Sequence, residues 1–328
     1  MHLPGAVQEL CVRFLSLVPE GLVTGLYLTG GTGFGEWIEG QSDVDFVATL
    51  THRPSDGEVE QLRQAHEQMA ASSPIDFDGM HVLVSDLASD PRKLPPVPVV
   101  LHREFRIGHL DQLVAWHELA RHGVTVTGPQ LSPLDIWTDR HVLHGYTVDN
   151  LDTYWRTITD QLATSSVDEP EAELDHACCW SVLGVARLHH LIVTAEMTTK
   201  SGAGRWGLSY YDQRWHRVLR EALRLREGGH PEYDDQVSRL QDTTDFTAYV
   251  VEAGTGRPGR ASSRLTREAR AARPPPVERG AVPPSSIVAI AHQAPTPLAG
   301  SRPPVPSTWA MTSSTSRGGM GWWATKRR

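Results

Sequence analysis

The sequence is poor in cysteine and has no long apolar run. Three of its 328 residues are cysteine, and two of these, Cys178 and Cys179, are adjacent. This arrangement provides neither a disulfide framework nor a zinc-binding pattern, so we expect the cysteines to be buried and to act as small hydrophobic residues. Because a membrane-spanning helix needs about 20 apolar residues, we expect no membrane span. Residues 1–19 have the spacing of an amphipathic helix rather than of a signal peptide, and we expect a cytoplasmic protein.

Histidine-based metal motifs are also lacking. The sixteen histidines are scattered along the chain, and none has the H-E-x-x-H spacing of a zinc site. Hydrophobic residues make up 39% of the sequence and charged residues 21%, which is ordinary for globular domains. A chain of 328 residues is long enough for two domains with separate cores.

Basic charge is concentrated at the C-terminal end. Residues 254–328 hold twelve Lys or Arg and two Asp or Glu, a net charge of +10; since the whole chain carries −8, residues 1–253 carry −18. An acidic body argues against nucleic acid as the main partner and would attract a cationic small molecule.

The same segment, 254–328, has an unusual composition. It contains eleven of the 23 prolines and no periodic apolar pattern, which predicts a disordered tail. A basic tail that binds RNA or a membrane surface is the alternative.

The chemistry-bearing stretch is 26–50, which reads LYLTGGTGFGEWIEGQSDVDFVATL. An apolar run ends at Gly30 and Gly31, and a second follows Asp43 and Asp45. Side chains alternate along a strand, so both aspartates would share one face while the intervening valine points into the core. Two carboxylates this close raise each other's pKa and suit Mg²⁺. The glycine turn allows a phosphate to approach the backbone.

This stretch resembles the polymerase-β-like nucleotidyltransferases, whose signature is a G-[GS] pair, a spacer and a D-x-D flanked by apolar residues. The segments LYLTG and SDVDFVA are most similar to the aminoglycoside 3''/9 adenylyltransferase branch. The resemblance covers about residues 20–251. It implies transfer of AMP from ATP, the co-substrate, to a hydroxyl of an aminoglycoside-like cationic molecule, with Mg²⁺ as cofactor. The sequence departs from that branch at Gly31, where serine is usual.

A third carboxylate is expected on the next strand, residues 75–84. Asp78 is the first candidate and Asp76 the second, because the reaction needs a further metal ligand or a group that takes the proton of the acceptor hydroxyl. In the family the corresponding acid is a glutamate on this strand, which this sequence lacks. A turn aspartate before Gly79 is the alternative reading.

The local patterns predict the elements around this site. Residues 55–71 form a helix capped by Ser55, with Glu58 at the position that a capping box requires. Residues 97–101, after a proline-rich turn, are expected to form an edge strand. Residues 111–122 have helical spacing.

The second half of the chain reads as helices that form an antiparallel bundle. They are expected at residues 148–163, 171–195, 215–225 and 233–251. The resemblance implies that Arg187 and Lys200 reach the nucleotide phosphates across the cleft, where cations would neutralise the charge of the leaving pyrophosphate. It also implies that Asp175 contacts the cationic substrate.

We therefore predict an α+β protein with an active site between two domains. The catalytic domain, 1–138, contains a mixed β-sheet; the helical domain, 139–253, binds substrate and nucleotide; and 254–328 form the tail. The predicted site residues are Asp43 and Asp45 for Mg²⁺, Asp78 for the hydroxyl, and, for the phosphates, Gly30, Gly31, Ser42, Arg187 and Lys200.

Two other functions remain open from the sequence. A nucleotidyltransferase that modifies a protein or tRNA would use the same three acids, and a non-catalytic member would bind nucleotide alone. We expect a monomer.

Overall fold

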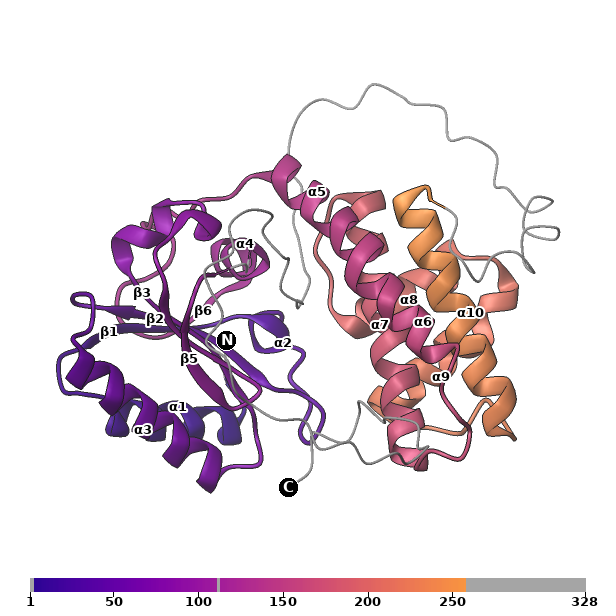
Figure 1. The fold of residues 1–328 in the computed structure, drawn as a ribbon, viewed down its shortest axis with the longest axis horizontal. Coiled ribbons are helices and arrows are strands. Elements are labelled where there is room, and N and C mark those ends of the chain that lie inside the picture. The colour runs from indigo at the N-terminus through magenta and orange to yellow at the C-terminus, as the bar shows by residue number, and fades with distance from the viewer. Residues whose placement is uncertain (1–2, 111–112, 258–328) are drawn as a thin grey trace, which may run out of the picture.

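The computed structural model describes residues 3–110 and 113–257, which form a sheet domain and a helical domain side by side (Figure 1). The predicted tail lies outside the described residues except for 254–257. The elements of the sheet domain are α1 (Gly5–Leu17), β1 (Val23–Leu28), α2 (Gly30–Gly33), β2 (Val44–Leu50), α3 (Asp56–Ser72), β3 (Phe77–Leu83), the 3-10 turns η1 (Val84–Ala88) and η2 (Pro91–Lys93), β4 (Val97–Leu101), β5 (Glu104–Gly108), α4 (Leu113–His122) and β6 (Val124–Thr127).

The six strands form one sheet in the order β5-β4-β3-β2-β1-β6. The neighbours β2 and β3 are parallel, and the other neighbouring pairs are antiparallel. The predicted α+β class with a mixed sheet is therefore confirmed. In the parallel pair, Asp45 is the register partner of Asp78, so the sheet itself brings these two acids together.

The prediction that residues 97–101 form an edge strand is wrong. They form β4, which lies between β3 and β5, and β5 occupies the edge. Proline at position 98 is tolerated because β4 pairs with β3 only through Val99 and Val100, so no hydrogen bond to β3 needs a donor from Pro98.

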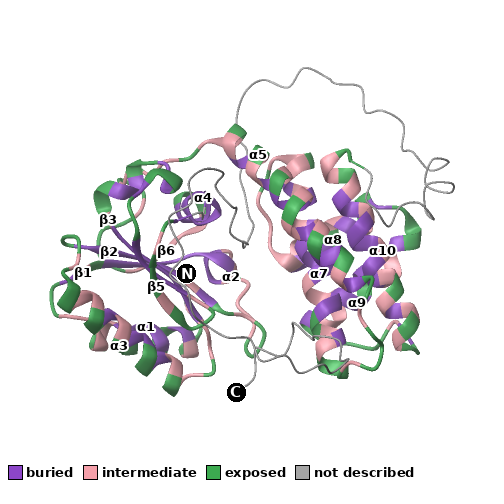
Figure 2. Ribbon diagram, viewed as in Figure 1, coloured by how far each residue is buried: buried purple, intermediate pink, exposed green. Residues whose placement is uncertain are grey.

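Helices cover both faces of the sheet. On one face, Phe14 of α1 packs against Phe46 and Phe77, with ring centroids 5.5 and 5.2 Å apart. On the other face, Trp116 of α4 belongs to a buried cluster with Tyr27 and other strand residues. Because both faces are covered, the central strands are buried along most of their length (Figure 2).

The capped helix expected at 55–71 is confirmed as α3. The Ser55 side chain accepts a hydrogen bond from Glu58 N–H, and the Glu58 carboxylate accepts one from Ser55 N–H at 2.8 Å. These bonds satisfy two backbone donors that a helix start would otherwise leave unpaired.

The helical domain consists of α5 (Arg140–Asn150), a π-helical turn η3 (Leu151–Trp155), α6 (Arg156–Leu162), α7 (Glu171–Thr194), α8 (Lys200–Tyr210), the 3-10 turn η4 (Gln213–Trp215), α9 (His216–Glu227) and α10 (Gln236–Thr255). The predicted helices correspond to α6, α7, α9 and α10. The boundary at residue 138 stays a prediction; Asp139 caps the start of α5.

The helix α8 was not predicted, because the glycines in its sequence have low helix propensity. A Cβ at Gly204 would lie 2.8 Å from side-chain atoms of Leu183 and Leu223, and one at Gly207 would lie 3.1 Å from Leu219. These glycines therefore allow α8 to approach α7 and α9 closely. Each glycine lowers the helix propensity of α8, but its lack of a side chain permits the close packing of α8 on its neighbours.

Among the described residues, one helix is long and apolar enough to cross a membrane. This is α7, and 61% of the relevant window is buried inside the protein. Val182 and Val185 lie in the core of the helical domain, where such an apolar helix is required to complete the bundle.

The three cysteines are free. Cys11 and Cys178 are buried, as expected, whereas Cys179 is partly exposed. Burial raises the pKa of Cys11 and that of Cys178 to about 12, so both thiols are protonated and unreactive at neutral pH.

Two histidines meet in the sheet-domain core. His66 of α3 and His81 of β3 are almost fully buried, and their Nε2 atoms are 3.3 Å apart. Burial lowers the pKa of both, that of His81 to about 4, and the neighbouring His81 ring lowers the pKa of His66 further. The folded protein therefore holds both rings neutral.

We expect this pair to make the protein less stable in acid. In the unfolded chain histidine takes up a proton near its free pKa of about 6.5, whereas folded His81 does so only near pH 4. The free energy of unfolding is therefore unaffected by His81 above about pH 6.5 and declines as the pH falls toward 4. His81→Gln should flatten this decline in the free energy of urea unfolding. The control His230→Gln, at an exposed position, should leave it unchanged; identical pH profiles for both variants would contradict the assignment.

Candidate active site

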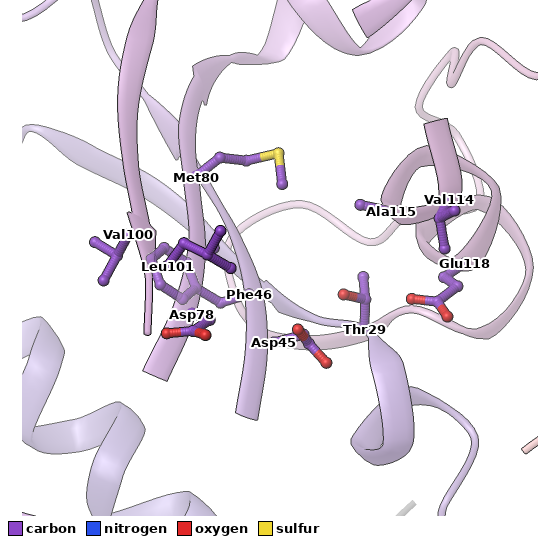
Figure 3. Close-up of a pocket in the computed structure, with 11 residues that line it drawn as sticks. Thr29, Asp45, Phe46, Asp78, Met80, Val100, Leu101, Val114, Ala115 and Glu118 are labelled. Atoms are coloured by element: carbon purple, nitrogen blue, oxygen red, sulfur yellow. The ribbon is translucent and has the colours of Figure 1, made fainter. Parts of the chain in front are cut away.

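Carboxylates from β2, β3 and α4 converge where the two parallel strands begin. Asp45 and Asp78 are register partners, and with Glu118 of α4 they line a pocket whose empty volume is about 420 Å³. Figure 3 shows Asp45 with Thr29 and Glu118 to one side of it and Asp78 on the other. The remaining walls are largely apolar.

The acids in this cluster repel one another. The pKa of Asp45 lies well above its ordinary value, first because of burial and then because of the charges of Asp43, Glu118 and Asp78. The predicted closeness of Asp43 and Asp45 agrees with this mutual effect. Arg187 acts in the opposite direction, so a positive charge is what the cluster needs to ionise fully.

The structure gives different surroundings to Asp78, on β3, and Asp76, which directly precedes β3. Asp78 is buried, its Oδ2 accepts a hydrogen bond from His102 N–H at 2.9 Å, and its Oδ1 has no hydrogen-bond partner among the described residues. Burial raises the pKa of Asp78 to about 6, although the bond from His102 opposes this. Asp76 instead forms an ion pair with Arg103. The geometry therefore favours Asp78 as the group that faces the acceptor.

Gly30 is in direct contact with the acid cluster. Its φ is +57°, and a Cβ there would lie 1.9 Å from Asp45 Oδ2. Its N–H donates to Glu118 Oε2 at 3.0 Å, so a phosphate oxygen would have to replace Glu118 at this donor. Ser42, also expected to contact phosphate, accepts a hydrogen bond from Ile38 N–H at 3.1 Å.

Glu118 was not identified from the sequence. It is 5% exposed, and burial raises its pKa to about 7, while Arg187 opposes the shift. The available signal was an acid between apolar positions of an amphipathic helix, next to Leu119. An acid in this pattern also fits the edge of a solvent-exposed helix face, so the sequence alone does not indicate a buried Glu118.

The helical domain contributes the positive charge. Arg187 of α7 and Lys200, the first residue of α8, both lie close enough for the sheet-domain acids to influence their pKa values, which burial lowers. Arg187 Nε is buried and has no hydrogen-bond partner in the described part of the chain. The structure thus brings both predicted phosphate ligands to the acid cluster.

Asp175 is placed differently. It forms an ion pair with Arg239 at 2.5 Å, and Arg239 also pairs with Glu221 at 3.1 Å. Its side chain is 35% exposed. These contacts make Asp175 part of a charged network within the helical domain, and its role toward a substrate stays a prediction.

Glu36 joins the two domains beside the site, and the sequence analysis did not identify it. Its Oε1 accepts hydrogen bonds from Ser201 Oγ and from Arg226 Nε, both at 2.9 Å. Burial opposes ionisation, but hydrogen bonds from Thr199, Ser201 and Arg226 lower the pKa of Glu36 overall. Because Ser201 follows Lys200, this contact fixes the start of α8 against the sheet domain.

Comparison with known proteins agrees with this architecture. Residues 152–253 match the family described as "Aminoglycoside adenylyltransferase, C-terminal domain". A solved structure, the spectinomycin adenyltransferase AAD(9) from Enterococcus faecialis with ATP and spectinomycin, shares the fold with a TM-score of 0.51 and 14% identity. The match covers 74% of this chain and 98% of that one. No curated protein sequence matches.

The fold and the family match both support a nucleotidyltransferase. Within that class, residues 152–253 are similar to the C-terminal domain of the aminoglycoside adenylyltransferases. This confirms the predicted resemblance from a different part of the chain, since the sequence motif lies in residues 26–50 and the family match in residues 152–253.

The two neighbouring glycines should differ in their tolerance of a side chain. Gly30→Ala forces a Cβ into Asp45 and strains a left-handed backbone, so it should weaken Mg²⁺–ATP binding about tenfold or more, equivalent to about 1.4 kcal/mol. In Gly31→Ala the nearest atom is Glu36 O at 3.0 Å, and binding should stay within about twofold. Calorimetric titration measures both, and equal affinities would contradict the assigned contact.

Removing the Glu36 carboxylate should loosen the contact between the domains. Glu36→Ala leaves Arg226, whose side chain is 7% exposed, without its acid, and we expect a loss of roughly 3 kcal/mol in the free energy of unfolding. Urea denaturation measures this. The control Glu39→Ala removes an exposed acid from the same loop and should change stability by less than about 0.5 kcal/mol. Equal stability of the two variants would refute the role of Glu36.

Proposed function

We propose that this protein transfers AMP from Mg²⁺-bound ATP to a hydroxyl of an aminoglycoside-like acceptor. The observation that carries this proposal is the opposition of charges between the domains. Asp45, Asp78 and Glu118 lie on the sheet domain, and Arg187 and Lys200 face them from the helical domain. The family match of the helical domain supports adenylyl transfer.

The donor set fits Mg²⁺. The ion prefers hard oxygen ligands and is usually held by one or two carboxylates together with substrate phosphates. No group of three His, Cys, Asp or Glu arranged for a metal occurs in residues 3–110 and 113–257. Asp43 and Asp45 would hold the ion, and the raised pKa of Asp45 indicates a place for positive charge. When bound, Mg²⁺ neutralises charge on the phosphates.

The remaining residues position the reactants. Asp78 accepts the proton of the acceptor hydroxyl on its unpartnered Oδ1. The hydroxyl oxygen then bonds to the α-phosphorus, the bond from that phosphorus to the bridging oxygen breaks, and pyrophosphate leaves. Arg187 and Lys200 neutralise the pyrophosphate, while Gly30 keeps the turn free of a side chain beside Asp45. Catalysis thus rests on alignment and charge neutralisation.

A cationic acceptor suits the charge of the protein. Residues 1–253 carry a net −18, which favours the approach of a polyamine by long-range attraction. Asp175 would be a further contact for an amine of the acceptor, and its carboxylate would then contact both that amine and Arg239. Since the AAD(9) structure was solved with spectinomycin, spectinomycin is the first acceptor to test.

Incubation of the full-length protein with radiolabelled ATP, Mg²⁺ and a panel of aminoglycosides tests the proposal. We expect label to appear on at least one antibiotic. Asp45→Asn should reduce the rate by about a hundredfold or more, because it removes a carboxylate that would hold the Mg²⁺ that neutralises the phosphates. The control Asp160→Asn, at an exposed position in the helical domain, should keep the wild-type rate.

Three outcomes would count against this function. Label transferred only to protein or tRNA in an added extract would replace the small-molecule acceptor with a macromolecule. ATP binding without transfer to any acceptor would indicate a non-catalytic protein. Equal rates for Asp45→Asn and Asp160→Asn would exclude the acid cluster as the reaction centre.

A further inference from the structure

The turn between β4 and β5 lies beside Asp78 and has an unusual conformation. Leu101 pairs with Glu104, so the turn consists of His102 and Arg103. Their φ angles are 50° and 67°, a left-handed geometry that suits tight hairpins and that glycine or asparagine usually supplies. For other residues it costs roughly 1–2 kcal/mol each. Contacts of the turn with its surroundings must offset this strain.

Arg103 makes those contacts. Its guanidinium pairs with Asp76, donates from Nη1 to Ala70 O at 2.7 Å, and donates from Nη2 to Ser73 O at 3.0 Å. All three partners lie at the end of α3 or in the segment that enters β3. The planar guanidinium therefore fixes the turn to the start of the strand that carries Asp78.

His102 connects the turn to Asp78 directly. Its backbone N–H donates to Asp78 Oδ2 at 2.9 Å, and Asp78 Oδ1 is buried without a hydrogen-bond partner among the described residues. A backbone donor held by a fixed turn cannot rotate away as a side chain can. The bond therefore determines which carboxylate oxygen faces the hairpin and which is left for the pocket.

We propose that Arg103 is a positioning residue that fixes the orientation of Asp78 through the His102 amide, with Asp76 as its anchor. The inference rests on the proposed function, because it takes Asp78 as the proton acceptor. It also gives a role to each of the two aspartates, Asp78 on β3 and Asp76 directly before it. One carries the chemistry, and the other holds the guanidinium that keeps the first in place.

Steady-state kinetics of the full-length protein test this role. Arg103→Ala should lower kcat about ten- to a hundredfold, the loss typical of a misplaced reacting group, while KM for ATP stays within about twofold. Asp76→Asn should lower kcat in the same way. The double variant should be no worse than Arg103→Ala alone, because both changes break one contact. The control Arg106→Ala, an exposed arginine on the same hairpin, should match the wild type.

Additive losses in the double variant, or equal kcat values for Arg103→Ala and Arg106→Ala, would overturn the proposal. Hydrogen exchange of the His102 amide gives a readout that does not require activity. Its protection should fall in Arg103→Ala and persist in Arg106→Ala, and unchanged protection in both would also overturn it. If the wild type modifies no acceptor, the proposed function fails, while the exchange rates still decide whether Arg103 holds the turn on Asp78.

Discussion

The repulsion between buried carboxylates at the start of β2 and β3 is the constraint on which the site depends. The parallel register places Asp45 opposite Asp78, and Glu118 of α4 adds a third acid to the same pocket. Burial is the first cause of the raised pKa values of all three, and the charge of Asp43 raises each of them further. A core built in this way is not optimised for stability. It is a place where positive charge is strongly favoured, whether it comes from a metal ion or from Arg187.

The helical domain supplies that charge, and its core also includes Leu113 and Val114 of α4. Its helices pack tightly enough, through glycines such as Gly204, to hold Arg187 and Lys200 in fixed positions. Glu36 then ties the start of α8 to the sheet domain. The acids and the bases therefore lie in different domains, and the Glu36 contact and the shared apolar cluster hold the two domains together.

The sequence predicted the parts of the fold that depend on local patterns. The capped helix α3, Asp45 of β2 with Asp43 just before the strand, and the apolar length of α7 all follow from spacing that neighbouring residues determine. The position of β4, the existence of β5 and the course of α8 depend on contacts between distant segments, such as Gly204 with Leu223. Glu118 and Glu36 were not predicted for the same reason, because their roles depend on hydrogen-bond partners 88 and 165 residues away in the sequence.

The distribution of thiols has a practical consequence. Cys11 and Cys178 are buried, and the only other cysteine of the sequence, Cys179, is partly exposed on α7. Burial raises the pKa of the Cys179 thiol, and the nearby charges of Lys200 and Arg226 oppose this rise. A maleimide dye should therefore attach at one native position next to the basic side chains. Its fluorescence would test the proposed binding of nucleotide at these side chains without any cysteine being engineered into the chain.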